Sequence, residues 1–121
     1  MARAASSLVL HLRELVHAGA GALEGVVRRP ALGNDGWFVN DRLFALVSRQ
    51  ARIVVKVPDA ATQKELLALG AEPWRIGKKA PMAAWLQLPE VMHDDETALD
   101  GCLERSWSLV RAAPAPKPRK R

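Results

Sequence analysis

The stretch WFVNDRLFALVSRQARIVVKV, residues 37–57, contains the strongest indications of the fold. Two runs of apolar and aromatic residues, 37–39 and 42–47, are separated by Asn40-Asp41. Such a pair between two such runs is typical of a two-residue hairpin turn, so both runs are expected to be strands. A second turn then leads into RIVVKV, residues 52–57, whose β-branched side chains favour a third strand.

Upstream of this stretch, the chain predicts a helix and a further strand. The segment LVLHLRELVHA, residues 8–18, places its apolar residues on one helical stripe. Ser6 or Ser7 is expected to cap this helix, and the two glycines just beyond it are expected to end it. A short strand is expected around residues 24–28, followed by a loop with the turn formers Pro30, Gly33, Asn34 and Gly36.

Downstream, two further helices are expected. Asp59 is the expected N-cap of a helix that ends near Gly70, and Pro73 prevents its continuation. Asp94 or Asp95 is expected to cap a final helix that runs to about residue 112, where acidic residues at the start and a basic residue at the end suit the helix dipole.

Between these two helices, residues 74–76 and 82–88 are expected to form a second hairpin around the loop GKKAP. The predicted order is therefore α-β-β-β-β-α-β-β-α. Because the strands come in hairpins and not in βαβ crossovers, we expect an antiparallel sheet with helices packed on it, an α+β two-layer fold. Residues 1–112 are expected to form a single domain, and residues 113–121 a disordered, Pro-rich basic tail.

The length and composition are those of one soluble globular domain. No apolar run approaches the roughly 20 residues of a membrane-spanning helix, and charges interrupt the apolar N-terminal run, so neither a span nor a signal peptide is expected. The single cysteine, Cys102, rules out an internal disulfide and a cysteine-clustered zinc site. A cytoplasmic location is therefore expected.

Few residues have the spacing of a catalytic or metal site. The histidines, His11, His17 and His93, lack the three- or four-residue spacing of two metal ligands on one helix face. The acidic residues after His93 are more simply the start of a helix than a cation site. Cys102 has apolar neighbours and is expected to be a small buried side chain. No enzyme activity, cofactor or metal is therefore expected.

The net charge of +5 is unevenly distributed. The last ten positions hold four basic residues and no acidic one, so the remainder is close to neutral and only a local patch or the tail is expected to bind phosphate. Solvated hairpin tips and a solubilising tail are the alternative interpretation. The candidate residues for nucleic-acid or partner binding are Arg28, Arg29, Arg75, Lys78, Lys79, Lys117, Arg119, Lys120 and Arg121.

The four tryptophans are expected to belong to the core. Trp37, Trp74 and Trp85 fall in predicted strands, and Trp107 falls in the last helix. A base-stacking platform needs several exposed aromatic residues on one basic sheet face, and the sequence does not indicate one.

Several segments, taken in order, resemble the N-terminal domain of TfoX/Sxy proteins, to which the small YjbR/MmcQ-like proteins are related. The resemblance covers about residues 8–112, but Ala31-Leu32-Gly33 replaces the family's Met-Phe-Gly triplet. The family's C-terminal domain is absent, so a stand-alone N-terminal domain is expected. The matching segments are Gly36-Trp37-Phe38, the N-D-R hairpin with Phe44 and Ala45, the strand R-I-V-V-K, the helix end L-G-A-E-P-W, and G-K-x-x-x-M at Gly77, Lys78 and Met82.

The resemblance implies a two-layer α+β fold of the secretion-chaperone-like kind and a bacterial role in transcription or competence regulation, without an active site. The first hypothesis is a non-enzymatic regulatory module that binds DNA weakly or acts on a protein of the transcription machinery. A second is a homodimeric, chaperone-like protein–protein interaction module with no DNA role. A third is a small-molecule or enzymatic role, which requires a deep polar cleft near His93 or Cys102.

Overall fold

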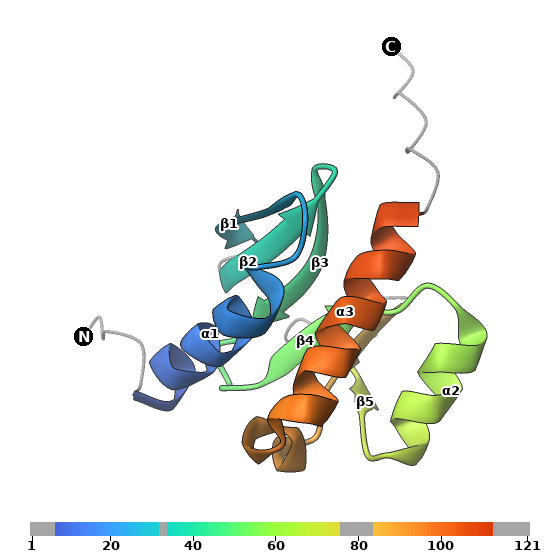
Figure 1. Cartoon of the computed structure of the whole chain (residues 1–121). Helices are drawn as coiled ribbons and strands as arrows, with labels where there is room; N and C mark the ends of the chain where they lie inside the picture. Colours follow the sequence, from blue (N-terminus) through green and yellow to red (C-terminus); the bar gives the residue numbers. More distant parts are fainter. Residues whose placement is uncertain (1–6, 32–33, 76–83, 113–121) are drawn as a thin grey trace.

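The computed structural model describes residues 7–31, 34–75 and 84–112. Within these residues, three α-helices, six strands and one 3₁₀ helix form an α+β fold in the predicted order, with the 3₁₀ helix as an addition (Figure 1). The elements are α1 (Ser7–Ala20), β1 (Val26–Ala31), β2 (Asn34–Val39), β3 (Arg42–Val47), β4 (Ile53–Lys56), α2 (Ala60–Ala68), β5 (Glu72–Pro73), β6 (Trp85–Gln87), η1 (Glu90–Asp94) and α3 (Glu96–Ala112).

The described strands form one antiparallel sheet in the order β1-β2-β3-β4-β6-β5. Strands β1 to β4 form a meander. The turn between β2 and β3 has the predicted two residues, and both take a positive φ, 53° at Asn40 and 62° at Asp41, as a type I′ turn requires. After β4 the chain passes through α2 to β5 at the sheet edge, and β6 then enters between β4 and β5.

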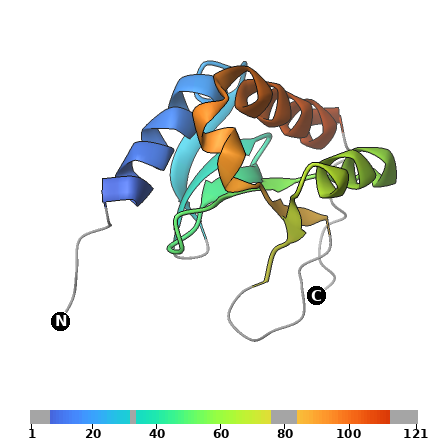
Figure 2. The same ribbon diagram turned by 90° about the horizontal axis from the view of Figure 1, so that it is seen from below.

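Helices α1 and α3 cover one face of the sheet, and α2 lies on the same side, next to α3 (Figures 1 and 2). The core between the layers includes Leu12 of α1, Trp37 and Phe44 of the sheet and Leu103 of α3, all fully buried. Burying an aliphatic or aromatic side chain of this size contributes roughly 1.5–3 kcal/mol. The Trp37 indole N–H donates to His17 Nδ1 at 3.1 Å, so its one polar group is satisfied at the edge of this core.

The opposite face of the sheet carries a second apolar cluster of Leu46, Val54, Trp74 and Trp85. The two tryptophan rings pack edge to face with their centroids 6.2 Å apart. Strand β4 is therefore apolar on both faces. The prediction that the strand tryptophans are core residues is confirmed, because Trp37, Trp74 and Trp85 are 0%, 5% and 7% exposed.

The strand expected around residues 24–28 and the loop after it instead form a hairpin of β1 with β2. Strand β1 spans Val26–Ala31 and not residues 24–28, and β2 begins at Asn34. The interpretation of Pro30, Asn34 and Gly36 as turn residues is wrong, because all three lie in paired strands. Pro30 is tolerated because β1 is an edge strand. Gly36 allows a close approach, since a Cβ there would lie 2.7 Å from a leucine side chain of β3.

The second hairpin is shorter than expected within the described residues. Strand β5 is Glu72–Pro73 and β6 is Trp85–Gln87, instead of residues 74–76 and 82–88. Residues 76–83 lie outside the described part of the chain. The Trp74 backbone N–H donates to the Trp85 carbonyl oxygen at 3.0 Å, which extends the pairing by one step. Pro73, which was expected only to stop a helix, therefore lies in β5. Because β5 is the other edge strand of the sheet, it tolerates a proline.

The predicted ends of α2 and the predicted start of α3 are confirmed, whereas Gly19 does not end α1, which runs on to Ala20. The Asp59 carboxylate accepts a hydrogen bond from the Thr62 backbone N–H at 3.0 Å at the start of α2, and Gly70 follows α2 with a φ of 110°. Asp95 caps α3 by accepting from the Ala98 backbone N–H at 3.1 Å. Among the helices of the described residues, none has both the length and the apolar character that crossing a membrane requires.

Candidate functional site

The two candidate arginines of β1, Arg28 and Arg29, point to opposite faces of the sheet, as successive strand residues do. Arg28 lies on the side covered by helices, with its guanidinium 2.6 Å from the Asp35 carboxylate and 5.2 Å from the centre of the Trp37 ring. Arg29 lies on the other side, 4.2 Å from the centre of the Phe38 ring. The two arginines therefore do not form one patch, and a carboxylate within the fold already balances the Arg28 charge.

The other candidate basic residues are only partly covered by the structure. Arg75 lies in the described part, exposed just after β5. Lys78, Lys79 and the four basic residues between positions 117 and 121 lie outside the described residues. Their role in binding stays a prediction.

The end of α3 is held beside the turn between β2 and β3. The Asn40 side-chain amide donates to the Arg111 carbonyl oxygen at 3.5 Å, and the Arg111 guanidinium is 3.0 Å from the Glu24 carboxylate. At the same turn, the guanidinium of Arg29 is 3.7 Å from the Asp41 carboxylate. Arg29 therefore lies at the same end of the molecule as the last turn of α3, from which the chain continues into residues 113–121.

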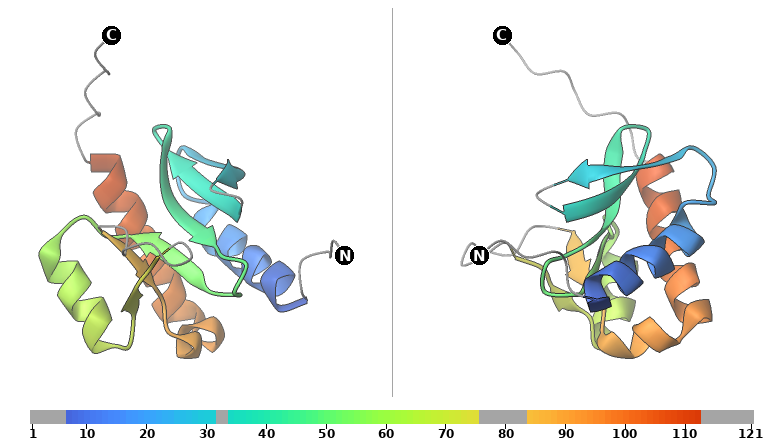
Figure 3. Two further views of the ribbon diagram at one scale, coloured as in Figure 1. Left: turned by 180° about the vertical axis from the view of Figure 1, so that it is seen from behind. Right: turned by 90° about the vertical axis from the view of Figure 1, so that its left-hand side faces the viewer.

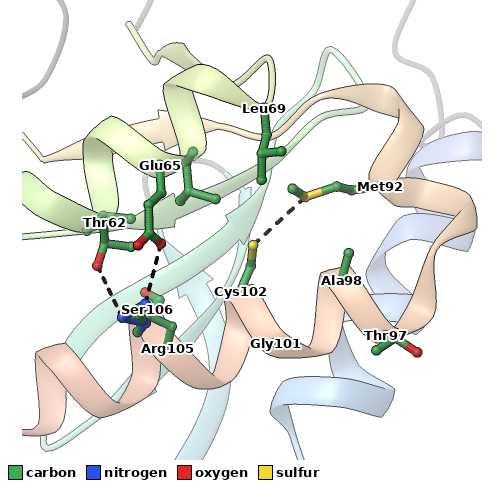
Figure 4. A pocket seen from close by; sticks show the side chains of 12 residues that line it. Thr62, Glu65, Leu69, Met92, Thr97, Ala98, Gly101, Cys102, Arg105 and Ser106 are labelled. Atoms are coloured by element: carbon green, nitrogen blue, oxygen red, sulfur yellow. Dashed lines mark hydrogen bonds and ion pairs between the residues drawn. The ribbon is translucent and has the colours of Figure 1, made fainter.

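A cavity of about 260 Å³ lies between α2, η1 and α3 (Figure 4). Apolar side chains form much of its wall: Leu66 and Leu69 come from α2 and its C-terminal end, Met92 from η1, and Ala98 and Cys102 from α3. The helix α2 runs beside α3 (Figure 3).

Polar groups gather at one end of this cavity. Arg105 of α3 reaches across to α2, with guanidinium nitrogens 3.4 Å from the Thr62 hydroxyl oxygen and 3.5 Å from the Glu65 carboxylate. Both contacts are long for hydrogen bonds and therefore weak. Thr62 in turn donates its hydroxyl proton to Asp59 at 2.9 Å. The hydrogen bond from the Thr62 backbone N–H lowers the pKa of the Asp59 carboxyl, so this cap is ionised at neutral pH.

Two sulfur atoms meet at the other end of the cavity, where Cys102 Sγ lies 3.9 Å from Met92 Sδ. Cys102 is half-buried and not fully buried as the sequence predicts. Burial raises the pKa of its thiol. Because the thiolate and not the thiol is the nucleophile, Cys102 acts at neutral pH as part of an apolar wall.

His93 does not line this cavity. Burial, followed by the positive charge of Arg52, lowers the pKa of its imidazole, and its Nε2 atom is buried without a hydrogen-bond partner among the described residues. The cavity beside Cys102 has a largely apolar wall, with charged and polar groups only at the end near Arg105. In the part of the chain that the structure describes, no three His, Cys, Asp or Glu side chains are placed to hold a metal ion.

Sequence reasoning missed the cavity because its parts are far apart along the chain. Thr62 and Arg105 are separated by 43 positions, and no local pattern connects them. The one local signal is Gly101, a glycine inside the 17-residue helix α3, where glycine is roughly 1 kcal/mol less favourable than alanine.

The six-stranded antiparallel sheet, with helices on one face and a cavity at the side of α3, defines a small two-layer α+β domain. The chain belongs to the TfoX N-terminal domain family, because the sequence model of that family matches residues 20–109. The resemblance inferred from the sequence is thereby confirmed. Family membership supports a regulatory, competence-related domain and no more specific function. No curated protein matches the chain.

Proposed function

We propose that this domain is a non-enzymatic regulatory module of bacterial transcription or competence that binds nucleic acid weakly and without sequence preference. The observation that carries the proposal is that the end of α3 lies beside the turn between β2 and β3. Arg29 reaches the same turn through its ion pair with Asp41. The sequence continues from this end into residues 113–121, which include four basic residues, and we infer that these residues and Arg29 contact the same phosphate backbone.

The charges around this end favour weak contacts with phosphate. Arg29 and Arg111 each face a carboxylate, but their side chains are 47% and 44% exposed. Exposed ion pairs contribute little, so a phosphate group competes readily with either carboxylate. Helix α3 carries more acidic than basic residues, which argues against a recognition helix that reads bases.

Fluorescence anisotropy with a labelled DNA duplex tests this proposal. If the four basic residues between positions 117 and 121 neutralise about four phosphates, the association constant falls by about 100-fold between about 50 and 200 mM salt. A chain that ends at Ala113 is expected to bind more weakly and to depend less on salt.

Two matched variants test the contribution of the folded part. Arg29→Gln is expected to weaken binding severalfold, whereas Arg49→Gln removes an exposed arginine at the other end of β3 and is expected to change binding little. Absence of binding by the full chain, or binding that does not change with salt, would contradict the proposal.

A protein-interaction role is a second candidate, favoured by the surface of α2. This helix buries only Thr62 and Leu66, whereas Leu67 and Leu69 are 44% and 62% exposed. If this surface pairs two copies of the chain, sedimentation at increasing concentration is expected to show a reversible dimer that Leu67→Ser and Leu69→Ser abolish. A monomer at every concentration would exclude the homodimer.

A further inference from the structure

We propose that the cavity between α2, η1 and α3 binds a small apolar carboxylic acid, with the carboxylate on Arg105 and the apolar part against Met92 and Cys102. The proposal goes beyond nucleic-acid binding and does not depend on it. It assigns the cavity to a small-molecule effector of the domain.

The first argument is that the two ends of the cavity differ in chemistry. Figure 4 shows Arg105, Glu65 and Thr62 together at one end, with Cys102 and Met92 toward the other. A ligand that matches both ends has an apolar body and a single group able to accept hydrogen bonds from a guanidinium. A carboxylate fits this requirement, because its two oxygens match the planar fork of an arginine.

The second argument is that the present partner of Arg105 is easily replaced. The Arg105 and Glu65 side chains are 49% and 64% exposed, and their closest approach is 3.5 Å. The Glu65 side chain is largely exposed, so its carboxylate is able to turn into water when another carboxylate arrives. The exchange gives Arg105 a new ion-pair partner and leaves the Glu65 carboxylate hydrated, so no charge is buried without a partner.

The third argument is size. An apolar cavity of about 150 Å³ holds a benzene molecule. The cavity here, at about 260 Å³, therefore has room for one six-membered ring with a carboxylate attached. The apolar atoms of such a ring would contact Leu66, Met92 and the Cys102 thiol, which burial keeps protonated and uncharged.

The fourth argument is that Gly101 lines the cavity and has unoccupied space beside it. Gly101 is an exposed residue of α3 that lines the cavity, and a Cβ built there meets no atom within 4 Å. The fold itself therefore has no steric need for glycine at this position. A larger side chain would fit the helix and would take up space at the wall of the cavity.

Binding is tested by differential scanning fluorimetry and by alkylation of Cys102 with iodoacetamide, using cyclohexanecarboxylate and benzoate as probes. Both probes are expected to raise the melting temperature and to slow the alkylation of the thiol. Acetate, which lacks the apolar body, and benzamide, which lacks the charge, are expected to act much more weakly.

Arg105→Gln is expected to weaken the binding of both acids by roughly 10- to 100-fold, the effect of losing a hydrogen bond to a charged group. Arg111→Gln is the matched control, because Arg111 lies on the same helix, is paired with a glutamate and is similarly exposed. Glu65→Gln is expected to strengthen binding, because it removes the carboxylate that competes for Arg105.

Gly101→Leu is expected to fold and to weaken binding, because the new side chain takes up space where Gly101 lines the cavity. Ser108→Leu is its control, because it adds the same side chain two turns further along α3, away from the cavity. The proposal is overturned if neither acid shifts the melting temperature or protects Cys102. It is also overturned if Arg105→Gln and Arg111→Gln bind the acids equally well, since the carboxylate would then not lie on Arg105.

Discussion

Replacement of Ser106 by alanine is expected to destabilise this domain, because Ser106 joins the last helix to the centre of the sheet. Its side chain is buried at 1% exposure, with Oγ 3.0 Å from the Phe44 carbonyl oxygen of β3 and 2.6 Å from the Lys56 carbonyl oxygen of β4. A hydroxyl has one proton and donates one hydrogen bond at a time, so the two carbonyl groups share a single donor.

The size of the effect follows from two opposing contributions. Loss of a buried hydrogen bond that leaves its acceptor unsatisfied costs about 1–3 kcal/mol. Alanine is favoured over serine within a helix by about 0.5 kcal/mol. Ser106→Ala is therefore expected to lower the free energy of unfolding by about 1–2 kcal/mol. For a domain of this length, each kcal/mol corresponds to a melting temperature lower by about 4 °C.

Urea denaturation followed by tryptophan fluorescence, together with calorimetry, measures this change. Ser108→Ala is the matched control, because Ser108 is exposed on the same helix and its replacement changes only the helix propensity. The difference between the two variants isolates the buried hydrogen bond. Equal stability of Ser106→Ala and Ser108→Ala would refute the reasoning that Ser106 anchors α3 to the sheet.

Four further outcomes are expected. His17→Ala removes the acceptor of the indole N–H of buried Trp37, so the free energy of unfolding falls by about 1–2 kcal/mol in urea denaturation. Because the folded state lowers the pKa of His93, the unfolded state binds the proton more tightly, so stability falls as the pH drops below about 6.5, and His93→Gln reduces this dependence. Because burial raises the pKa of Cys102, its alkylation in the absence of ligand is slower at pH 8 than that of a free thiol and accelerates only at higher pH. Gly70→Ala forces a side chain into a φ of 110° and destabilises the domain by about 1 kcal/mol or more.

Each of these four predictions has a result that would contradict it. His11→Ala is the control for His17→Ala, since His11 is exposed on the same helix, and equal effects would show that the indole bond is unimportant. An unchanged pH profile in His93→Gln would assign the acid sensitivity to other groups. Wild-type alkylation of Cys102 at the rate of a free thiol would show that the cavity is open to solvent on the timescale of the reaction. If Gly70→Ala leaves the free energy of unfolding unchanged, the backbone after α2 must adjust to a conformation that alanine tolerates.

Local sequence signals predicted most of the elements of this fold. The Asn40-Asp41 turn, the Asp59 and Asp95 caps and the glycine after α2 each act through backbone groups a few residues away, so composition and spacing suffice to recognise them. Proline and glycine did not indicate the strand ends correctly in the pair of β1 and β2. Pro30 breaks a strand only where its missing N–H is needed, and whether a strand lies at the sheet edge depends on all the other strands.

The candidate sites were less predictable because they join distant parts of the chain. The sequence indicates that residues 28 and 29 are basic, but only the pairing of β1 with β2 decides that Arg28 faces Asp35 and that Arg29 faces Phe38. The cavity has the same origin, because Arg105 and Thr62 come together only when α2 is placed beside α3.

The sequence by itself therefore determined the α+β class, the order of the elements, the ends of α2, the start of α3 and membership in the TfoX N-terminal domain family. The tertiary structure alone decided that β6 lies between β4 and β5, that basic side chains are divided between two faces, and that a cavity lies between α2 and α3. The physical reason is the distance along the chain over which each kind of interaction acts. Hydrogen bonds within turns and caps are local, whereas strand order and cavities arise from burying apolar surface between segments far apart in the chain.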